Sequence, residues 1–432
     1  MRIRLEALAV CTAAVLAGMA VTTPIDFGWA AAGSTPNLQL MLFNVPRAAA
    51  CAALAAVLVS VMCESVTVRT TWLIASGSAL LLASNHLLAR AMSGEVLSLG
   101  LVDTIVGGAL LGALPALAGR RRTAQAALLL GALSGVIIAG RFTVTGHGDD
   151  ARSALQWALF DPPPMALIIL ALGLLIWGAW THRHAEPAPT AEVPLRPVAA
   201  VLVLLVLSLL RTDWLAGQNN WSFRMIAGIG LTALATLVAA LLLPGRDGVL
   251  LALAFAFTVA GGAVVLAGPL PAWSVPLVIA AVAAGLACGV RWPRPVAAVA
   301  VTIALAVFAT TTRVHAPIPV ALIAMTVAAV GGYCLATVLP QDPPTTVVAL
   351  VTLITPSIVA ALVNRRYHHI ADSKVWFRSP SWASWAPGWA AVVVTASAGI
   401  IALALPHLRH SSPPTQRPSA PMVTVGCGPL AP

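Results

Sequence analysis

Residues 98–141 read SLGLVDTIVGGALLGALPALAGRRRTAQAALLLGALSGVIIAGR, two apolar runs separated by the three arginines Arg120, Arg121 and Arg122. Each run is roughly 20 residues long, the length that an α-helix needs to cross the hydrocarbon core of a bilayer. A cluster of arginines between two such runs is typical of the short loop that joins two membrane spans. This stretch therefore predicts a transmembrane helical hairpin.

The same alternation of apolar runs and short charged clusters continues through the whole chain of 432 residues. Apolar residues make up 59% of it and charged residues only 9%, and the mean hydropathy is +0.93. Because a water-soluble protein needs far more charge on its surface, we predict an all-α integral membrane protein. The predicted spans, about fourteen by their length, cover residues 5–24, 45–64, 71–92, 98–118, 123–141, 163–181, 197–214, 224–243, 248–268, 273–291, 295–312, 316–339, 346–364 and 388–406.

The net charge of +10 comes almost wholly from arginine, since Lys374 is the only lysine. Binding of nucleic acid is not expected, because it needs a basic face on a soluble module and the chain has none. Most arginines fall in every second loop, which predicts that these loops and both termini are cytoplasmic. The abundance of arginine, alanine, valine and leucine indicates a high-GC bacterial genome, that of an actinobacterium, and hence the bacterial plasma membrane.

The chain contains an apparent internal repeat. Arg47 followed by AAACAALAAVLVSVMC is similar to Arg224 followed by MIAGIGLTALATLVAALLL, and GGALLGALPALAGRRR is similar to AAVAAGLACGVRWPRP. Units repeated in the same orientation predict two six-helix bundles related by an axis normal to the membrane, followed by a C-terminal two-helix hairpin. The predicted units are a first bundle (1–184), a cytoplasmic Pro/Ala linker (185–196), a second bundle (197–340), an additional hairpin (341–410) and a disordered tail (411–432).

Two six-helix halves, a central linker and arginine-rich turns resemble the major facilitator superfamily of secondary transporters over roughly residues 1–340. That family's turn after the second helix usually reads Gly-x-x-x-Asp-Arg-x-Gly-Arg-Arg. The chain keeps Gly245-Arg246-Asp247-Gly248 of this motif, whereas its first-half turn, Glu64–Arg69, lacks the glycines. The fourth helix has Asp103-x-x-x-Gly107 where many proton-coupled members have Arg-x-x-x-Gly. The resemblance implies a transporter that is not an enzyme.

Asp103 is the first candidate site residue, because it lies one to two turns inside an apolar run. A carboxylate facing lipid at mid-depth costs about 2.5–3.5 kcal/mol. We therefore expect Asp103 to face a cavity or a partner and to bind a proton or a cation, or else to lie hydrated at the outer interface. His86 and Arg90, late in the third span, share a helix face and form a second candidate; the alternative for His86 is a hydrogen-bonded histidine at a helix end.

A further group of candidate residues shares one property: each falls at an outer helix end. The arginines would suit phosphate or carboxylate groups of a solute in an outward-facing vestibule, and the alternative is snorkelling at the membrane interface. The group consists of Asp26, Arg47, Arg141, Arg211, Asp213, Arg224 and Arg313.

The loop at 365–389 is basic and rich in tryptophan. Trp382, Trp385 and Trp389 are spaced i, i+3 and i+7, as on one face of an interfacial helix. With Arg365 and Arg366 beside them, these residues predict contact with anionic lipid or a glycolipid, or an aromatic belt that seats the final hairpin.

No metal or cofactor is predicted, because the six cysteines form no CxxC or Cys/His spacing. Gly108-x-x-x-Gly112 and Gly131-x-x-x-Gly135 instead predict packing, with the fourth and fifth spans close to one another.

Three functions remain open from the sequence. The first is a secondary transporter or exporter of a small or amphipathic solute. The second is a non-catalytic membrane subunit of a cell-envelope or secretion assembly, with unknown membrane protein partners. The third is a glycosyltransferase that uses a polyprenyl-phosphate sugar, for which Asp26 would be the acid of the first outer loop. Two pseudo-symmetric bundles would favour the first, and an outer cleft at Asp26 would favour the third.

Overall fold

The computed structural model describes residues 2–22, 38–91, 96–119, 121–139, 163–184, 194–216, 221–264, 271–311, 317–340, 342–355, 367–369, 376–378 and 386–410. The described helices before the linker are α1 (Arg2–Thr22), α2 (Leu38–Glu64), α3 (Val68–Ala91), α4 (Val96–Ala118), α5 (Arg122–Ala139) and α7 (Met165–Thr181). After the linker come α8 (Leu195–Ala216), α9 (Trp221–Leu242), α10 (Asp247–Ala263), α11 (Val275–Arg291), α12 (Pro295–Thr311), α13 (Pro317–Thr337), α14 (Pro343–Ile354) and α16 (Ala386–His410). A short 3-10 helix, η1 (Ala272–Ser274), precedes α11.

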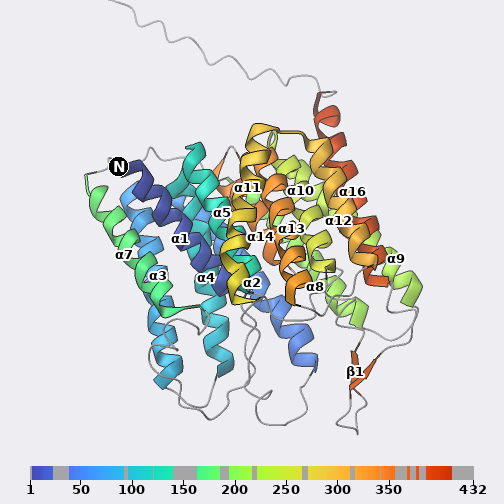
Figure 1. Cartoon of the computed structure of the whole chain (residues 1–432), viewed down its shortest axis with the longest axis horizontal. Coiled ribbons are helices and arrows are strands. Elements are labelled where there is room, and N and C mark those ends of the chain that lie inside the picture. The colour runs from blue at the N-terminus through green and yellow to red at the C-terminus, as the bar shows by residue number, and fades with distance from the viewer. Residues whose placement is uncertain are drawn as a thin grey trace, which may run out of the picture.

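Each predicted span corresponds to one of these α-helices, so the all-α membrane fold is confirmed (Figure 1). Seven of the described helices are long and apolar enough to cross a bilayer, and the other seven contribute shorter apolar stretches of 10–17 described residues. Backbone groups inside a bilayer must be hydrogen-bonded within the protein, which is why apolar runs of this length form helices. The turns between them contain residues that stop a helix: Gly119 after α4 and Gly245 after α9 both adopt a positive φ.

Strands β1 (Tyr367–His369) and β2 (Trp376–Arg378) pair antiparallel, with Tyr367 opposite Arg378. This hairpin lies within the predicted basic loop, at the end of the molecule opposite the N-terminus (Figure 1). Of the predicted aromatic face, Trp389 lies in α16 and is 57% exposed. Trp382, Trp385, Arg365 and Arg366 lie outside the described residues.

The helices before the linker form one packed group. Within it α1 packs against α4, α5 and α7, α2 packs against α4, and α3 packs against α4 and α7. Trp72 of α3 is 2% exposed, and its indole ring lies over the backbone of Gly178 in α7, where a methyl group would not fit.

The same packing recurs after the linker, beginning at α10. Helix α10 packs against α13, α14 and α16, α11 packs against α13, and α12 packs against α13 and α16. The six packing relations named for the first group are all reproduced when α1, α2, α3, α4, α5 and α7 are replaced by α10, α11, α12, α13, α14 and α16. The two groups are therefore two bundles of the same connectivity, as expected for a parallel duplication.

This correspondence differs from the predicted division of the chain. The helices that repeat the first bundle span residues 247–410, whereas the sequence predicted 197–340. The two helices without a counterpart are α8 and α9, not a C-terminal hairpin. Helix α8 packs against α2 and α9, and α9 packs against α10 and α16. The similarity of the sequences after Arg47 and Arg224 therefore does not mark equivalent helices, because α2 corresponds to α11.

Small residues allow the closest helix contacts. A methyl group added to Gly108 or Gly112 of α4 would collide with the backbone of Ala52 or Ala56 in α2. The equivalent pair, α11 and α13, is equally close at Gly285 and Gly289. Without a hydrophobic driving force between helices in lipid, such close van der Waals packing holds the bundle together.

The glycine pattern in the fifth span works in the same way but with another partner. Gly131 and Gly135 of α5 lie against the backbone of Cys11 and Val15 in α1. The prediction that the glycine patterns of the fourth and fifth spans face one another was therefore wrong, since each span uses its glycines against a different helix.

The two bundles meet through few helices. In the first bundle α2 and α4 contact α14, and in the second bundle α11 and α13 contact α5. These contacts are interchanged by the helix correspondence given above, so the interface has the pseudo-two-fold relation of the bundles themselves.

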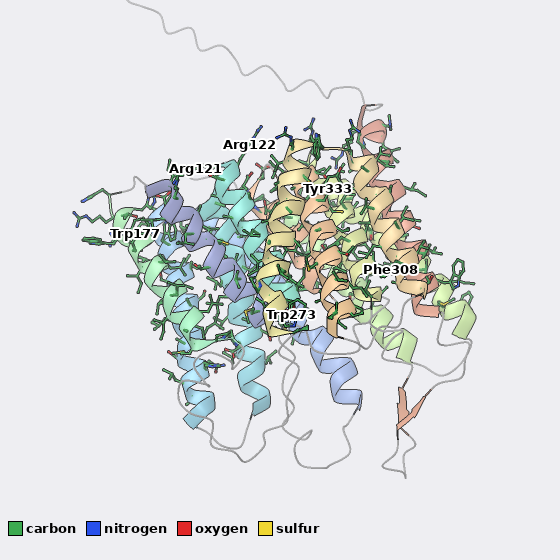
Figure 2. All side chains as sticks on the ribbon, viewed as in Figure 1. Arg121, Arg122, Trp177, Trp273, Phe308 and Tyr333 are labelled. Carbon is green, nitrogen blue, oxygen red and sulfur yellow. The ribbon has the colours of Figure 1, made fainter. Side chains whose placement is uncertain are left out.

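The arginines whose side chains the structure describes gather at one end of the molecule, here called the basic edge. Figure 2 shows Arg121 and Arg122 at this edge, with Trp273 and Phe308 towards the other end. The first residue of α1 and the last turn of α16 lie at the same edge (Figure 1). All arginines whose side chains the structure describes belong to turns or helix ends on this side: Arg4, Arg69, Arg121, Arg122, Arg183, Arg196, Arg246, Arg291, Arg294 and Arg409.

Candidate functional site

Asp103 is hydrogen-bonded inside the first bundle. It is the eighth residue of α4, and its Oδ1 accepts a hydrogen bond of 2.8 Å from Nδ2 of Asn85 in α3. Helix α4 begins at Val96, so Asp103 lies about 10 Å along the helix axis from its first residue at 1.5 Å per residue. The expectation that Asp103 faces a partner is met by Asn85, whose neutral amide donates to the carboxyl group.

His86 is 7% exposed and lies next to Asn85 in α3, away from the basic edge. Arg90 belongs to the last turn of the same helix, and its side chain lies outside the described residues. The structure therefore brings Asp103 and Asn85 together, and His86 is the next residue of α3.

The predicted ring at the outer helix ends is only partly described. The backbones of Arg211 and Asp213 lie in the last turns of α8, and that of Arg224 in the first turn of α9, at the end opposite the basic edge. Arg47 is the tenth residue of α2, which begins earlier than predicted, so Arg47 is not at a helix end. Asp26, Arg141 and Arg313 lie outside the described residues.

The equivalences predicted inside this ring do not hold. Arg47 was paired with Arg224 and Arg141 with Arg313, but α2 corresponds to α11 and α5 corresponds to α14. The residues of each pair are therefore not related by the repeat.

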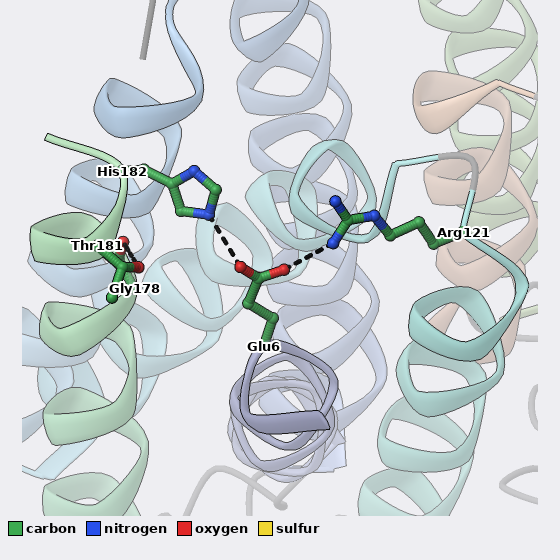
Figure 3. A network of polar contacts seen from close by, with 5 residues as sticks. All are labelled: Glu6, Arg121, Gly178, Thr181 and His182. Atoms are coloured by element: carbon green, nitrogen blue, oxygen red, sulfur yellow. Dashed lines mark hydrogen bonds and ion pairs between the residues drawn. The ribbon is translucent and has the colours of Figure 1, made fainter. Parts of the chain in front are cut away.

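Glu6 organises a second polar cluster, at the basic edge (Figure 3). Its Oε2 accepts a hydrogen bond of 2.8 Å from Arg121, and its Oε1 lies 3.2 Å from Nε2 of His182. The ring of His182 also stacks on Trp72, with 6.1 Å between the ring centroids. One carboxylate thus joins the beginning of α1 to the α4–α5 turn and to the end of α7, which fixes the basic edge of the first bundle.

A cleft of about 1420 Å³ opens at the basic edge between α5 and the second bundle. Arg122 and Gln125 line it from the first bundle, and Arg246, Asp342 and His407 are among the residues that line it from the second. Arg122 and Arg246 are exposed, so their guanidinium groups can attract anions to this cleft.

Gln125 crosses the boundary between the bundles. Its Nε2 donates to the carbonyl oxygen of Pro340, in the α13–α14 turn, at 3.2 Å, and to that of Gly119, after α4, at 3.1 Å. The side chain is 8% exposed. It is therefore a buried, specific link between the two bundles on the cleft side.

The Gly245–Gly248 turn anchors the second bundle. Asp247, 1% exposed at the start of α10, accepts a hydrogen bond of 2.7 Å from the Thr345 hydroxyl of α14. Arg409 of α16 donates to the carbonyl oxygens of Ala240, Leu243 and Gly245, which caps the end of α9. A carboxylate at a helix N-terminus and a guanidinium at a helix C-terminus both suit the helix dipole.

Sequence reasoning missed Glu6, Gln125 and Thr345 as polar links. Glu6 had a usable signal, because it is the one acid in the first apolar run. Gln125 and Thr345 gave none, since single neutral polar residues are common in membrane helices. Among the described residues no group of three or more His, Cys, Asp or Glu side chains could hold a metal ion.

No protein-family model matches the chain, and no curated protein matches it. Among solved structures, a similar chain is the proton:xylose symporter XylE of the major facilitator superfamily, bound to 6-bromo-6-deoxy-D-glucose. The two chains are 12% identical with a TM-score of 0.47, over 94% of this chain and 95% of the symporter. At this identity no binding residue of the symporter can be transferred to this chain.

Proposed function

We propose that the chain is a secondary transporter of a small solute, in which the two bundles rock against one another to expose a site between them to either side. The repeated packing of α1–α7 and α10–α16 carries this proposal. Each bundle is densely packed internally and meets the other through a few symmetry-related helices. That is the construction of a rigid-body switch, because the contacts between the bundles can exchange while those inside them persist.

The hydrogen bond between the bundles at the basic edge supports the same proposal. Gln125 bonds across the bundles at the basic edge, and the Glu6 cluster holds the first bundle together there. By the distribution of arginine we assign the basic edge to the cytoplasm, with both termini on that side. Gln125 and Pro340 would then part when the transporter opens inwards.

The chemistry of the cleft narrows the class of solute. Arg122 and Arg246 favour a solute that carries a carboxylate or phosphate group. Asp103 lies outside this cleft, against Asn85 in the first bundle, and its carboxyl group can gain and lose a proton. We assign to it the coupling of transport to a proton gradient.

Spin labels test the rocking motion without knowledge of the solute. In a variant whose six cysteines are replaced by alanine, one label pair goes at Arg69→Cys and Arg294→Cys on the basic edge, and another at Leu88→Cys and Phe308→Cys near the opposite end. We expect two distance populations for each pair in lipid nanodiscs, and a shift of pH should lengthen one distance while it shortens the other.

The matched control joins Arg69→Cys to Arg183→Cys, since α3 and α7 belong to one bundle. Its distance should stay single under all conditions. A single, unchanging distance for both pairs between the bundles would refute alternating access. Uptake of labelled sugars, organic acids and phosphate esters into proteoliposomes, with and without a proton gradient, then identifies the solute.

A further inference from the structure

Helix α14 ends inside the membrane. It begins at the basic edge and has 12 residues, which at 1.5 Å per residue cover about 18 Å of a hydrocarbon core of about 30 Å. Its cap, Thr355, is extended with φ −74° and ψ 129°. Pro356 follows in the sequence, and a proline disfavours the helical conformation of the residue before it, here Thr355.

The proline also removes a hydrogen-bond donor. Thr355 N–H still reaches the carbonyl oxygen of Val351, at 3.0 Å. The next bond of the helix would run from residue 356 to the carbonyl oxygen of Thr352, and Pro356 has no N–H to make it. The helix thus directs the negative end of its dipole, about half an elementary charge, towards the middle of the bilayer.

A small cavity lies at this helix end, here called the hydroxyl cavity. It is lined by Leu204, Leu207, Ser208, Thr232, Ala235, Phe255, Thr352 and Thr355. Its volume of about 20 Å³ is enough for one water molecule or one small ion. Ser208 of α8 and Thr232 of α9 face the end of α14 here, and Thr232 is near the middle of its helix, which places the cavity near mid-depth.

The hydroxyl oxygens of Thr352 and Thr355 are available to accept a further hydrogen bond or to bind a cation. Thr352 donates its proton to the carbonyl oxygen of Ala349 at 2.6 Å, and Thr355 donates to that of Val351 at 2.8 Å. A hydroxyl group that donates to the backbone keeps its oxygen lone pairs for another partner. Thr352 and Thr355 are 1% and 9% exposed, and none of the eight lining residues is basic.

We propose that the hydroxyl cavity binds a sodium ion. Neutral hydroxyl and carbonyl oxygens at the C-terminal end of a broken helix are suitable ligands for a small alkali cation within a membrane. The ligands would be the Thr352 and Thr355 hydroxyls and the Thr352 carbonyl on α14, with Ser208 and Thr232 opposite. Helices α8 and α9 have no counterpart in the first bundle. Their role in this proposal is to supply the ligands that complete the ion site.

The ion would also link moving parts of the molecule. Helix α14 contacts α2 and α4 of the first bundle, and its first turn is held to α10 by Thr345 and Asp247. An ion bound at the end of α14 would therefore stabilise the arrangement in which that helix is correctly seated. Binding at equilibrium requires no transport, so the ion site and the proposed transport function can fail separately.

Binding of radioactive sodium to the full chain in nanodiscs tests the site directly. We expect saturable binding that unlabelled sodium displaces, and that potassium or choline displaces poorly. Thr352→Val removes the hydroxyl at nearly constant shape. Pro356→Ala restores an N–H for the Thr352 carbonyl without touching the cavity side chains. Each should weaken sodium affinity about tenfold or more, equivalent to about 1.4 kcal/mol.

The matched control is Thr326→Val. Thr326 lies on an exposed face of α13 and makes the same kind of bond, to the carbonyl oxygen of Leu322 at 2.9 Å. Its sodium affinity should stay within about twofold of the parent. Absence of saturable sodium binding by the parent chain would overturn the proposal, as would equal affinity in Thr352→Val, Pro356→Ala and the parent.

Discussion

Gln125 of α5 donates a hydrogen bond of 3.2 Å to the carbonyl oxygen of Pro340, in the turn that precedes α14. The two residues are 215 positions apart and belong to different bundles. Because both groups are buried, the bond has little competition from water. It joins the bundles on the cleft side, where an inward-opening transporter would have to separate.

Gln125→Leu should therefore shift the bundles towards the state that is open at the basic edge. The variant leaves the Pro340 carbonyl without this donor, a loss of about 1 kcal/mol from the closed state and a change of about fivefold in the ratio of the two populations. The spin-label pair at Arg69→Cys and Arg294→Cys measures it. Ser397→Ala, on an exposed face of α16, is the control and should leave the ratio unchanged.

Asp103→Asn and Asp103→Leu separate the structural and coupling roles of this side chain. Asparagine can still pair with Asn85, so its melting temperature should stay near that of the parent while uptake no longer responds to a proton gradient. Leucine removes the acceptor of the buried Asn85 amide and should cost about 1–3 kcal/mol of stability. Unchanged proton dependence in Asp103→Asn would show that this carboxyl group does not couple transport.

Gly112→Val should destabilise the first bundle by several kcal/mol, because the new side chain would meet the backbone of Ala56 in α2. Gly77→Ala is the matched control, since nothing lies near the added methyl group there. It should be neutral or stabilising by about 0.5–1 kcal/mol through helix propensity. Thermal unfolding in detergent followed by tryptophan fluorescence compares the two, and equal melting temperatures would contradict the close α2–α4 contact.

Glu6→Gln should loosen the basic edge only slightly. The substitution removes the charge that faces Arg121 and His182, and ion pairs of this exposure contribute about 0–1 kcal/mol. We expect a small decrease in melting temperature that disappears at high salt, because salt screens the interaction in the parent. The control is Arg291→Gln, a substitution of an exposed basic residue at the same edge. A large decrease in the melting temperature of Glu6→Gln at every salt concentration would show that the cluster does more than pair charges.

The sequence predicted the helices well and their partners poorly. Apolar runs and charged turns are local signals, so every predicted span contains a helix, although α14 ends at Ile354 where the prediction ran to residue 364. The pairing failed because runs of alanine, leucine and valine, such as those after Arg47 and Arg224, look alike whether or not their helices are equivalent. Partner choice depends on where small residues meet, for example Gly285 of α11 against Ala329 of α13, and one sequence does not show which two faces meet.

For the candidate site too, the sequence showed the local features but not the contacts between helices. Asp103 was identified because a lone acid in an apolar run is costly and must have a reason. The link between Gln125 and Pro340 was not predictable, because it joins a common neutral side chain to a backbone group. The break in α14 had a visible sign in Thr355-Pro356, but its importance depends on the hydroxyl groups that α8 and α9 bring to it.

In chain order α8 and α9 lie between the two bundles, and their even number matters for the direction in which the second bundle crosses the membrane. The first bundle brings the chain back to the basic edge, and a pair of helices leads away from that edge and returns to it. The second bundle therefore enters the membrane in the same direction as the first, which a single extra helix would have reversed. Only an even insertion preserves the two-fold relation between the halves, so natural or engineered variants should lose these two helices together or retain both.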